Sequence, residues 1–206
     1  MKILIIVAVV LVLWSLWGYF SSRVEQAEYT VLRKADGYEV REYSARIVAQ
    51  TTVDGTYDEA LNKGFSIIAG YIFGGNVRKE SVAMTAPVTV KEFESETIAM
   101  TAPVVARADG AAYTISFVMP KSYTLDSLPT PVDSRVTLVQ EPAKKMAVLR
   151  FSTAWSAKRV KNKEEQLLSM LSRDAVKVIR NPAFAGYNAP WAPPWMIRNE
   201  VMVEIE

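Results

Sequence analysis

Residues 46–73, RIVAQTTVDGTYDEALNKGFSIIAGYIF, combine a strand pattern and a helix pattern in one continuous stretch. The alternating, β-branched segment Arg46–Val53 predicts a strand. Thr56 and Glu59 then form a capping box, and the apolar residues after it recur at helical spacing, namely Leu61, Phe65, Ile68 and Ile72. Because Gly74-Gly75-Asn76 would end such a helix, we expect a helix over about Tyr57–Phe73.

The order of strands, helix and strands occurs twice along the chain. Strands are predicted at Tyr29–Arg33, Tyr38–Tyr43, Val82–Val90, Ile98–Ala106 and Ala112–Met119, and again at Arg135–Gln140, Met146–Phe151, Phe184–Asn188 and Glu200–Ile205. A second helix is predicted over about Ser156–Val178. This order indicates an α+β fold, in which two similar halves close one mostly antiparallel sheet or barrel with a helix packed on each half. Since no long linker interrupts residues 28–206, we expect them to form one domain.

Two residue types are missing, because the chain contains no histidine and no cysteine. A Ser-His-Asp triad, a histidine ligand to haem iron, a thiolate nucleophile and an iron–sulfur cluster are therefore excluded. The 24 Lys and Arg residues against 22 Asp and Glu residues give a net charge of +2. Nucleic-acid-binding proteins normally carry a basic surplus, so nucleic acid is not indicated as a partner.

The first 27 residues differ from the rest. The run Ile3–Phe20 is uncharged and strongly apolar. As a helix it would be about 27 Å long, close to the ~30 Å hydrocarbon core of a bilayer. We therefore expect residues 1–27 to contain an N-terminal signal anchor, a transmembrane helix followed by a short linker, with the domain on the exported side. A cleaved signal peptide is the alternative, but its apolar region is usually shorter.

A hexapeptide is repeated without change: Ala83–Val88 and Ala99–Val104 both read AMTAPV. On the structural interpretation, each copy is a short strand whose proline lies at an edge, a bulge or a strand end. On the functional interpretation, Met84 or Met100 presents a polarizable thioether to a flat apolar ligand. Physical arguments alone favour the structural interpretation, since methionine is more often a core residue.

A proline-rich segment precedes the last strand, with the sequence GYNAPWAPPW over residues 186–195. Prolines fix an extended loop, on which Trp191 and Trp195 could form the wall of an apolar pocket or cover the end of the sheet. Arg198 and Glu200 alternate on the strand that follows, and we expect them to pair.

Several motifs together resemble the SOUL haem-binding protein family. They are YEVREY at Tyr38–Tyr43, GYIFGGN at Gly70–Asn76, both AMTAPV copies, SFVMP at Ser116–Pro120, and the closing Tyr187-Asn188-x-Pro190-Trp191 with Arg198-Asn199-Glu200-Val201. The resemblance covers about Tyr29–Ile205, and the N-terminal apolar run lies outside it. It implies a distorted β-barrel of two similar halves flanked by two long helices, with reversible, non-covalent binding of haem or another tetrapyrrole.

The resemblance also implies a site, which is an apolar groove beside the first helix. Carried over to this chain, its residues are Asn62, Lys63, Phe65, Ile68, Ala69, Ile72, Met84, Tyr187 and Trp191. Because histidine is absent, the candidates for an iron ligand are Tyr71, Tyr187 and Met84. Binding without histidine or cysteine should be exchangeable, so the expected function is haem carriage, buffering or delivery at a membrane. The alternatives are a tetrapyrrole-modifying enzyme and an effector-binding or scaffolding domain for another apolar ligand.

Overall fold

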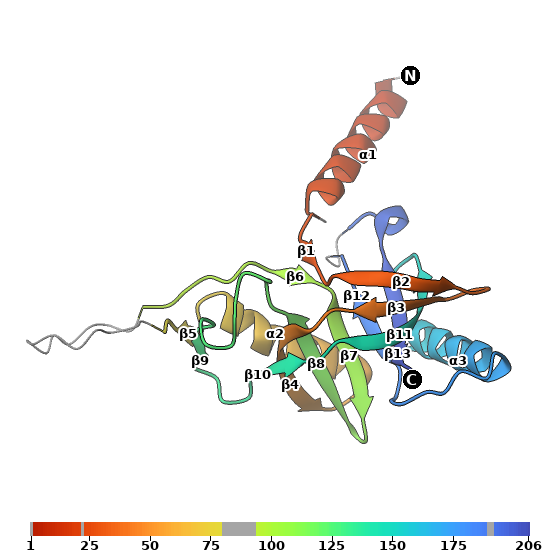
Figure 1. The fold of residues 1–206 in the computed structure, drawn as a ribbon. Coiled ribbons are helices and arrows are strands. Elements are labelled where there is room, and N and C mark those ends of the chain that lie inside the picture. The colour runs from red at the N-terminus through yellow and green to blue at the C-terminus, as the bar shows by residue number, and fades with distance from the viewer. Residues whose placement is uncertain (1, 22, 80–93, 189–191) are drawn as a thin grey trace, which may run out of the picture.

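A curled antiparallel sheet forms the body of the protein, as the computed structural model in Figure 1 shows. The structure describes residues 2–21, 23–79, 94–188 and 192–206. Within these ranges, nine strands share the sheet in the spatial order β10 (Thr137–Glu141), β4 (Arg46–Asp54), β8 (Ala112–Val118), β7 (Val104–Asp109), β12 (Ala183–Gly186), β13 (Asn199–Glu204), β11 (Lys144–Phe151), β3 (Glu39–Tyr43) and β2 (Tyr29–Lys34). Two small pairs lie beside it, β1 (Glu25–Gln26) with β6 (Thr101–Ala102) and β5 (Asn76–Val77) with β9 (Thr130–Pro131). The predicted strand at Val82–Val90 lies outside the described residues.

The expected duplication is visible in the strand order. The first half runs β3, β4, helix α2 (Tyr57–Ile72), β7 and β8, and the second runs β10, β11, helix α3 (Ala157–Arg173), β12 and β13. In each half, the strand before the helix and the two strands after it pair in the same manner, as β4-β8-β7 and β11-β13-β12. Strand β7 joins the halves by pairing with β12. The first strand of each half pairs with the other half, β3 with β11 and β10 with β4. Both AMTAPV copies belong to the first half of the sequence. The short repeat is therefore separate from the duplication of the fold.

The sheet is open, which corrects the expectation of a closed barrel. Among the described residues, β10 and β2 stand at the two ends of the strand order and are not paired with each other. Strand β2 is exposed along most of its length, contains an irregularity between Val31 and Arg33, and carries the charged pair Arg33 and Lys34. Bulges and charges are features that prevent further pairing at a sheet edge. The result is a curled half-barrel.

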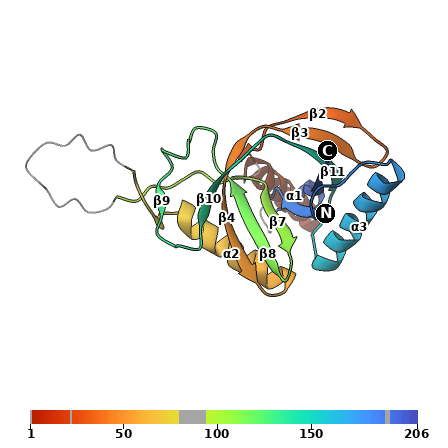
Figure 2. The same cartoon turned by 60° about the horizontal axis from the view of Figure 1, so that its bottom comes forward.

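Both helices pack on the same face of the sheet, which we call the outer face (Figure 2). Helix α2 covers a core that includes Ala106, and α3 covers a core that includes Phe184. These two residues are direct cross-strand partners, so their side chains leave the sheet on one side. Their neighbours Val105 and Ala185 point to the other side, the inner face, and belong to a third cluster.

Helix α2 begins as predicted, because Thr56 and Glu59 form the capping box. It also approaches the sheet closely at Gly64, where a Cβ would lie 2.4 Å from the Cγ1 atom of Ile115. A side chain at this position would force the helix away from β8, so glycine is required by packing.

Helix α3 is shorter than predicted. It begins after the cap Ser156 and buries Val160, Leu167 and Leu171 as expected, but it ends at Arg173 rather than near Val178. Ala175 takes a positive φ of 53°, which is incompatible with a continuing right-handed helix. The apolar residues after it leave the helix.

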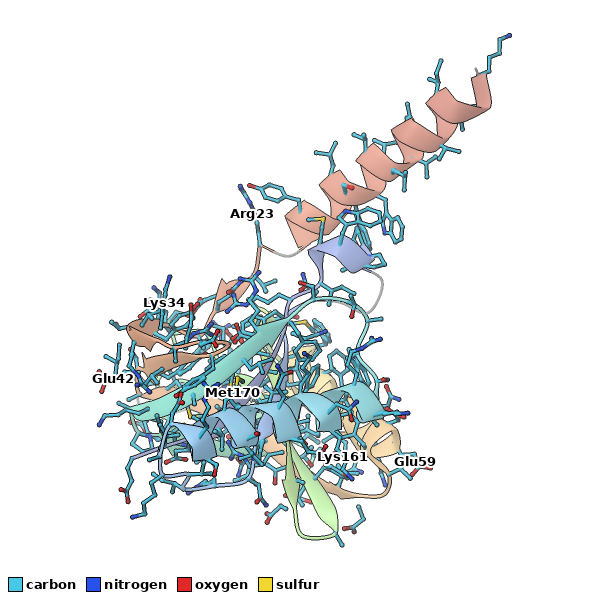
Figure 3. All side chains as sticks on the ribbon, turned by 90° about the vertical axis from the view of Figure 1, so that its right-hand side faces the viewer. Arg23, Lys34, Glu42, Glu59, Lys161 and Met170 are labelled. Carbon is cyan, nitrogen blue, oxygen red and sulfur yellow. The ribbon has the colours of Figure 1, made fainter. Side chains whose placement is uncertain are left out.

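Helix α1 (Lys2–Ser21) projects from the domain, with Arg23 close to its base (Figure 3). It contacts the domain at the 3₁₀ turn η1 (Pro194–Met196), where the rings of Trp14 and Trp195 lie 5.4 Å apart. Among the described residues, no helix has both the length and the hydropathy needed to cross a membrane. The transmembrane helix expected from the sequence is therefore not shown.

Candidate ligand-binding site

The predicted groove residues on α2 divide between its two sides. Ile68 and Ile72 are fully buried in the core between α2 and the sheet, where they contact protein rather than ligand. Asn62, Lys63 and Phe65 are exposed, and Ala69 is half-buried. The site implied by the family resemblance therefore includes residues from both the buried and the exposed side of the helix.

An apolar stripe remains on the exposed side of α2 and its C-cap. Phe65, Ala69 and Phe73 follow one another at intervals of four residues, so they lie on the same side of the helix; we call them the α2 stripe. Phe65 is 38% exposed and Phe73 is 59% exposed. Nearby, a Cβ built at Gly70 would meet no atom of the described residues within 4 Å, so they leave the space above Gly70 open. Sequence reasoning did not include Phe73, although its spacing from Phe65 and Ala69 was a readable signal.

The α2 stripe is continuous with the core beneath it. The ring of Phe65 lies 5.2 Å from the ring of the buried Phe117 on β8. This contact holds one edge of the stripe against a rigid strand, while Phe73 remains free to cover a ligand. A flat apolar molecule could therefore lie over Phe65, Ala69 and Phe73, and Lys63 is an exposed cation elsewhere on the same helix.

Tyr187 lies on the inner face, away from α2, in a group that we call the Glu200 cluster. The group consists of Arg41, Tyr43, Tyr187, Arg198 and Glu200. The Glu200 carboxylate is 0% exposed; it accepts hydrogen bonds from Arg41 Nη1 at 3.0 and 3.1 Å, from Arg198 Nη2 at 2.8 Å and from the Tyr187 hydroxyl at 2.8 Å. The predicted pair of Arg198 and Glu200 is thus confirmed.

The charges in the Glu200 cluster support one another. Burial alone would lower the pKa of Arg41, but the negative charge of Glu200 and the interactions with Tyr43 and Glu39 together outweigh burial and raise it. Burial, together with the same carboxylate, raises the pKa of Tyr187 well above its usual range. In addition, the Arg198 guanidinium lies 3.8 Å from the centre of the Tyr187 ring. The cluster is an ion-pair network centred on Glu200, in which Arg41 also donates to Glu39 and Arg198 also donates to Gln26.

The candidate iron ligands do not gather at one point. The Tyr71 hydroxyl is buried and donates to the backbone oxygen of Pro129 at 2.9 Å. Burial, with contributions from Tyr123 and Glu96, raises the pKa of Tyr71, which disfavours the phenolate form. Tyr187 is engaged by Glu200 on the other face. Neither arrangement favours iron ligation. Met84 and Trp191 lie outside the described residues, and in the described part of the chain no group of three or more acidic residues could hold a metal ion.

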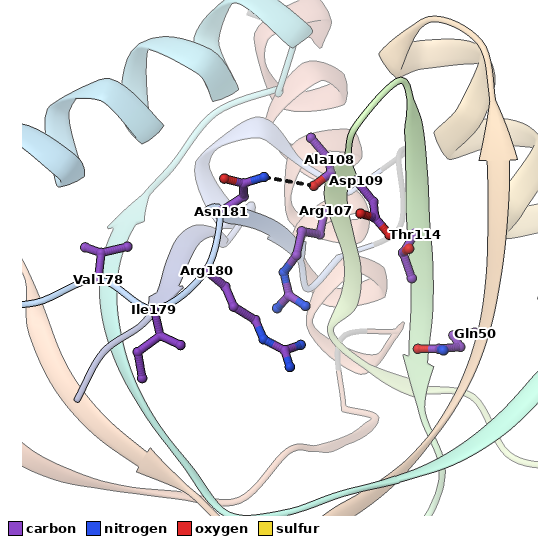
Figure 4. Close-up of a pocket in the computed structure, with 9 residues that line it drawn as sticks. All are labelled: Gln50, Arg107, Ala108, Asp109, Thr114, Val178, Ile179, Arg180 and Asn181. Carbon is purple, nitrogen blue, oxygen red and sulfur yellow. Dashed lines mark hydrogen bonds between the residues drawn. The ribbon is translucent and has the colours of Figure 1, made fainter.

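A cavity with a volume of about 700 Å³ opens on the inner face (Figure 4). It lies between strands β4, β7 and β8 on one side and residues 178–181, which follow α3, on the other. Arg107 and Arg180 both extend into it. We call it the arginine cavity. Sequence reasoning missed it entirely, because its residues are distant in the sequence and form no local motif.

An open half-barrel with two helices on its outer face is a fold shared with solved structures. The C-terminal domain of EcmrR aligns with a TM-score of 0.57 at 8% sequence identity, covering 86% of this chain and 98% of that domain. An uncharacterized conserved protein from Listeria innocua aligns with a TM-score of 0.50 at 12% identity, covering 82% of this chain and 92% of that one. At these identities the likeness establishes the fold alone.

Similarity in sequence is more specific. The family model described as SOUL heme-binding protein matches residues 24–204. Heme-binding protein 2 from Homo sapiens is 30% identical over 162 residues, which covers 74% of this chain and 71% of the human protein. Heme-binding protein 2 from Mus musculus is 29% identical over 178 residues, or 81% of each chain. The chain therefore belongs to the SOUL heme-binding protein family.

Proposed function

We propose that this protein binds haem or a related tetrapyrrole reversibly and non-covalently, on the α2 stripe. Family membership and the names of the two mammalian relatives support the ligand. The observation that carries the location is the exposure of Phe65 and Phe73 on one side of α2, beside the open space at Gly70. A porphyrin is flat and largely apolar, so it matches this surface better than it matches the charged inner face.

The residues of the stripe determine how such a ligand is held. Phe65 and Phe73 supply apolar and ring contacts, and Ala69 between them leaves room for a flat molecule. Lys63 offers a positive charge to a propionate group. Since the described tyrosines near the helix are not available to iron, retention rests on shape and apolar contact, which predicts exchangeable binding. We propose carriage, buffering or delivery as the role that such binding serves.

Titration with hemin tests this proposal. We expect the full chain in mild detergent to shift the Soret band and to bind saturably. Phe65→Ser and Phe73→Ser each remove roughly 60 Å² of apolar contact, which at about 25 cal/mol per Å² costs about 1.5 kcal/mol, close to a tenfold loss of affinity. Leu32→Ser is the matched control, because Leu32 is similarly exposed but lies on the edge strand β2.

Two results would contradict the proposal. An unshifted Soret band would show that the protein does not bind hemin. Equal affinity in the wild-type chain and both phenylalanine variants would show that the α2 stripe is not the binding site. Loss of the Soret band with bilin products under a reductant would instead indicate a tetrapyrrole-modifying enzyme.

We further propose that α1 attaches the domain to a membrane, with the domain on the exported side. The uncharged run Ile3–Phe20 supports attachment, as do the exposed apolar side chains of α1, among them Val10, Leu13 and Trp17. The chain should remain in the membrane fraction after carbonate extraction, and Val10→Lys should release it while Leu32→Lys should not. Phosphatase and green fluorescent protein fusions at Glu206 would test the side; fluorescence without phosphatase activity would contradict export.

A further inference from the structure

Arg107 carries a positive charge, and its buried Nε atom meets no hydrogen-bond acceptor among the residues that the structure describes. Its side chain leaves β7 on the inner face, because its cross-strand partner Ala183 belongs to the inner-face cluster. Burial lowers the pKa of Arg107, the charge of Glu141 only partly opposes this, and the nearby Arg180 lowers it further. Leaving a buried cationic donor unsatisfied is costly, so this feature calls for an explanation.

Glu141 and Glu204 both oppose the lowering of the Arg107 pKa, but each also interacts with another cation, and the Oε2 atom of Glu204 has no hydrogen-bond partner in the described part of the chain. Glu141 accepts from Arg46 at 3.0 Å and from Lys144 at 2.9 Å. Glu204 lies 3.4 Å from Arg180, a longer and weaker approach. Together with Arg107 and with Asp109, which lines the cavity, these side chains contain four positive charges against three negative charges. The arginine cavity therefore has an excess of positive charge beside it, even though the protein as a whole is almost neutral.

The shape of the cavity indicates the kind of molecule that would supply the missing charge. Its volume of about 700 Å³ falls within the range of small-molecule sites. Thr114 and Asn181 add polar groups, and Val178 and Ile179 add an apolar wall. Asp109 lies at the exposed hairpin end, so an anionic group would be directed away from it and toward the arginines.

We propose that the arginine cavity binds a small organic anion whose carboxylate or phosphate group lies between Arg107 and Arg180. The planar guanidinium of arginine binds both groups through paired hydrogen bonds. This site is separate from the proposed tetrapyrrole site, because the cavity lies on the inner face and the α2 stripe belongs to the helix on the outer face. The protein would then hold two ligands on opposite sides of one sheet.

Calorimetric titration of the full chain at low salt tests the proposal with three small molecules that share a phenyl ring. Phenyl phosphate and benzoate differ in the anionic group, and benzyl alcohol is the neutral analogue. We expect at least one anion to bind saturably and benzyl alcohol not to bind, with the stronger anion identifying the preferred group. Arg107→Gln and Arg180→Gln should each weaken binding at least tenfold. Arg135→Gln is the matched control, since Arg135 is exposed and paired with Asp133 elsewhere.

The variants must also remain folded for the test to decide. Because the Nε atom of Arg107 has no hydrogen-bond partner among the described residues, Arg107→Gln should not lower the melting temperature of the ligand-free protein. If it does, Arg107→Lys keeps the charge without the planar fork and should give intermediate affinity. The proposal is overturned if neither anion binds, if benzyl alcohol binds equally well, or if Arg107→Gln leaves the affinity unchanged.

Hemin titrations of the wild-type chain and of Arg107→Gln distinguish this proposal from the proposed function. Arg107→Gln should leave hemin affinity unchanged, and phenyl phosphate should not displace hemin. Weaker hemin binding in Arg107→Gln, together with displacement, would mean that the cavity is the tetrapyrrole site and would overturn a separate anion site. Failure of hemin to bind at all would contradict the proposed function, but it would not affect the result for the anion site.

Discussion

Two groups of arginine side chains on the inner face differ in how completely their charge is neutralised. In the Glu200 cluster, Arg41 and Arg198 converge on one buried carboxylate, and aromatic rings cover both guanidinium groups. In the arginine cavity, the Nε atom of Arg107 has no acceptor among the described residues and Arg180 has only a distant one. The same residue type thus completes a structural network in one place and leaves an unmet charge in the other. We infer from this difference that an unsatisfied charge, rather than the presence of a charge, points to a ligand site.

Removing the charge of Glu200 should have the largest effect on stability. Glu200→Gln would leave Arg198 without a counter-charge and Arg41 with only the partly exposed Glu39, and breaking a buried pair from one side costs about 3–5 kcal/mol. Denaturant unfolding measures this loss directly. A loss below about 1 kcal/mol would mean that water reaches the cluster and that its two arginines do not depend on Glu200.

Two tyrosine variants give a smaller and more selective comparison. Tyr187→Phe removes the hydroxyl that donates to Glu200 but keeps the ring under Arg198, so we expect a loss of about 1.5–3 kcal/mol in the free energy of unfolding. Tyr57→Phe is the control, because its buried hydroxyl has no hydrogen-bond partner and its removal should cost nothing or stabilise the protein. Equal losses in both variants would contradict the importance of the hydrogen bond.

Glu141 should make part of the stability depend on acid pH. Burial would raise its pKa, but the charges of Arg46 and Lys144 outweigh burial and lower it. A carboxyl group whose pKa is lower in the folded state stabilises the fold above its unfolded pKa of about 4.3, and this contribution is lost as the pH falls through the folded value. Glu141→Gln should therefore cost about 1–2 kcal/mol at pH 7.

Unfolding measured at a series of pH values checks this sign. The gap between the wild-type chain and Glu141→Gln should close as the pH approaches 3. A gap that stays constant between pH 7 and pH 3 would show that the charge of Glu141 is not responsible.

The smallest effect is expected at Arg107. Arg107→Gln removes a buried charge that Glu141 and Glu204 offset only in part, so the unfolding free energy of the ligand-free protein should change by less than about 0.5 kcal/mol or should rise. A loss as large as that of Glu200→Gln would mean that Arg107 belongs to a completed network after all.

Local patterns predicted much of the fold. The alternation in Arg46–Val53, the capping box at Thr56 and the spacing of Ile68 and Ile72 each depend on neighbouring residues, and all three were confirmed. The end of α3 was missed because apolar residues continue at helical spacing past Ala175, whose positive φ has no signal in the side chains around it.

The candidate site was predicted less well, for two physical reasons. The family resemblance carries over positions along α2 without separating its buried side from its exposed side, so Ile68 and Ile72 were grouped with Phe65. Arg107 and Arg180 come together only through the pairing of β7 with β12, which no local pattern reports. The predicted roles of the α2 residues and of Tyr187 remain predictions for the hemin titration.

The exchange of first strands between the halves also constrains when the protein can fold. During synthesis, β3 emerges early, yet its partner β11 begins only at Lys144, and β7 must wait for β12 at Ala183. Neither half can complete its own sheet, because each lends a strand to the other. Pairings between residues so distant in sequence form slowly, since the loop between them must close first. The nascent chain therefore carries unpaired strand edges until almost its last residues are made, and a C-terminally truncated chain would retain them.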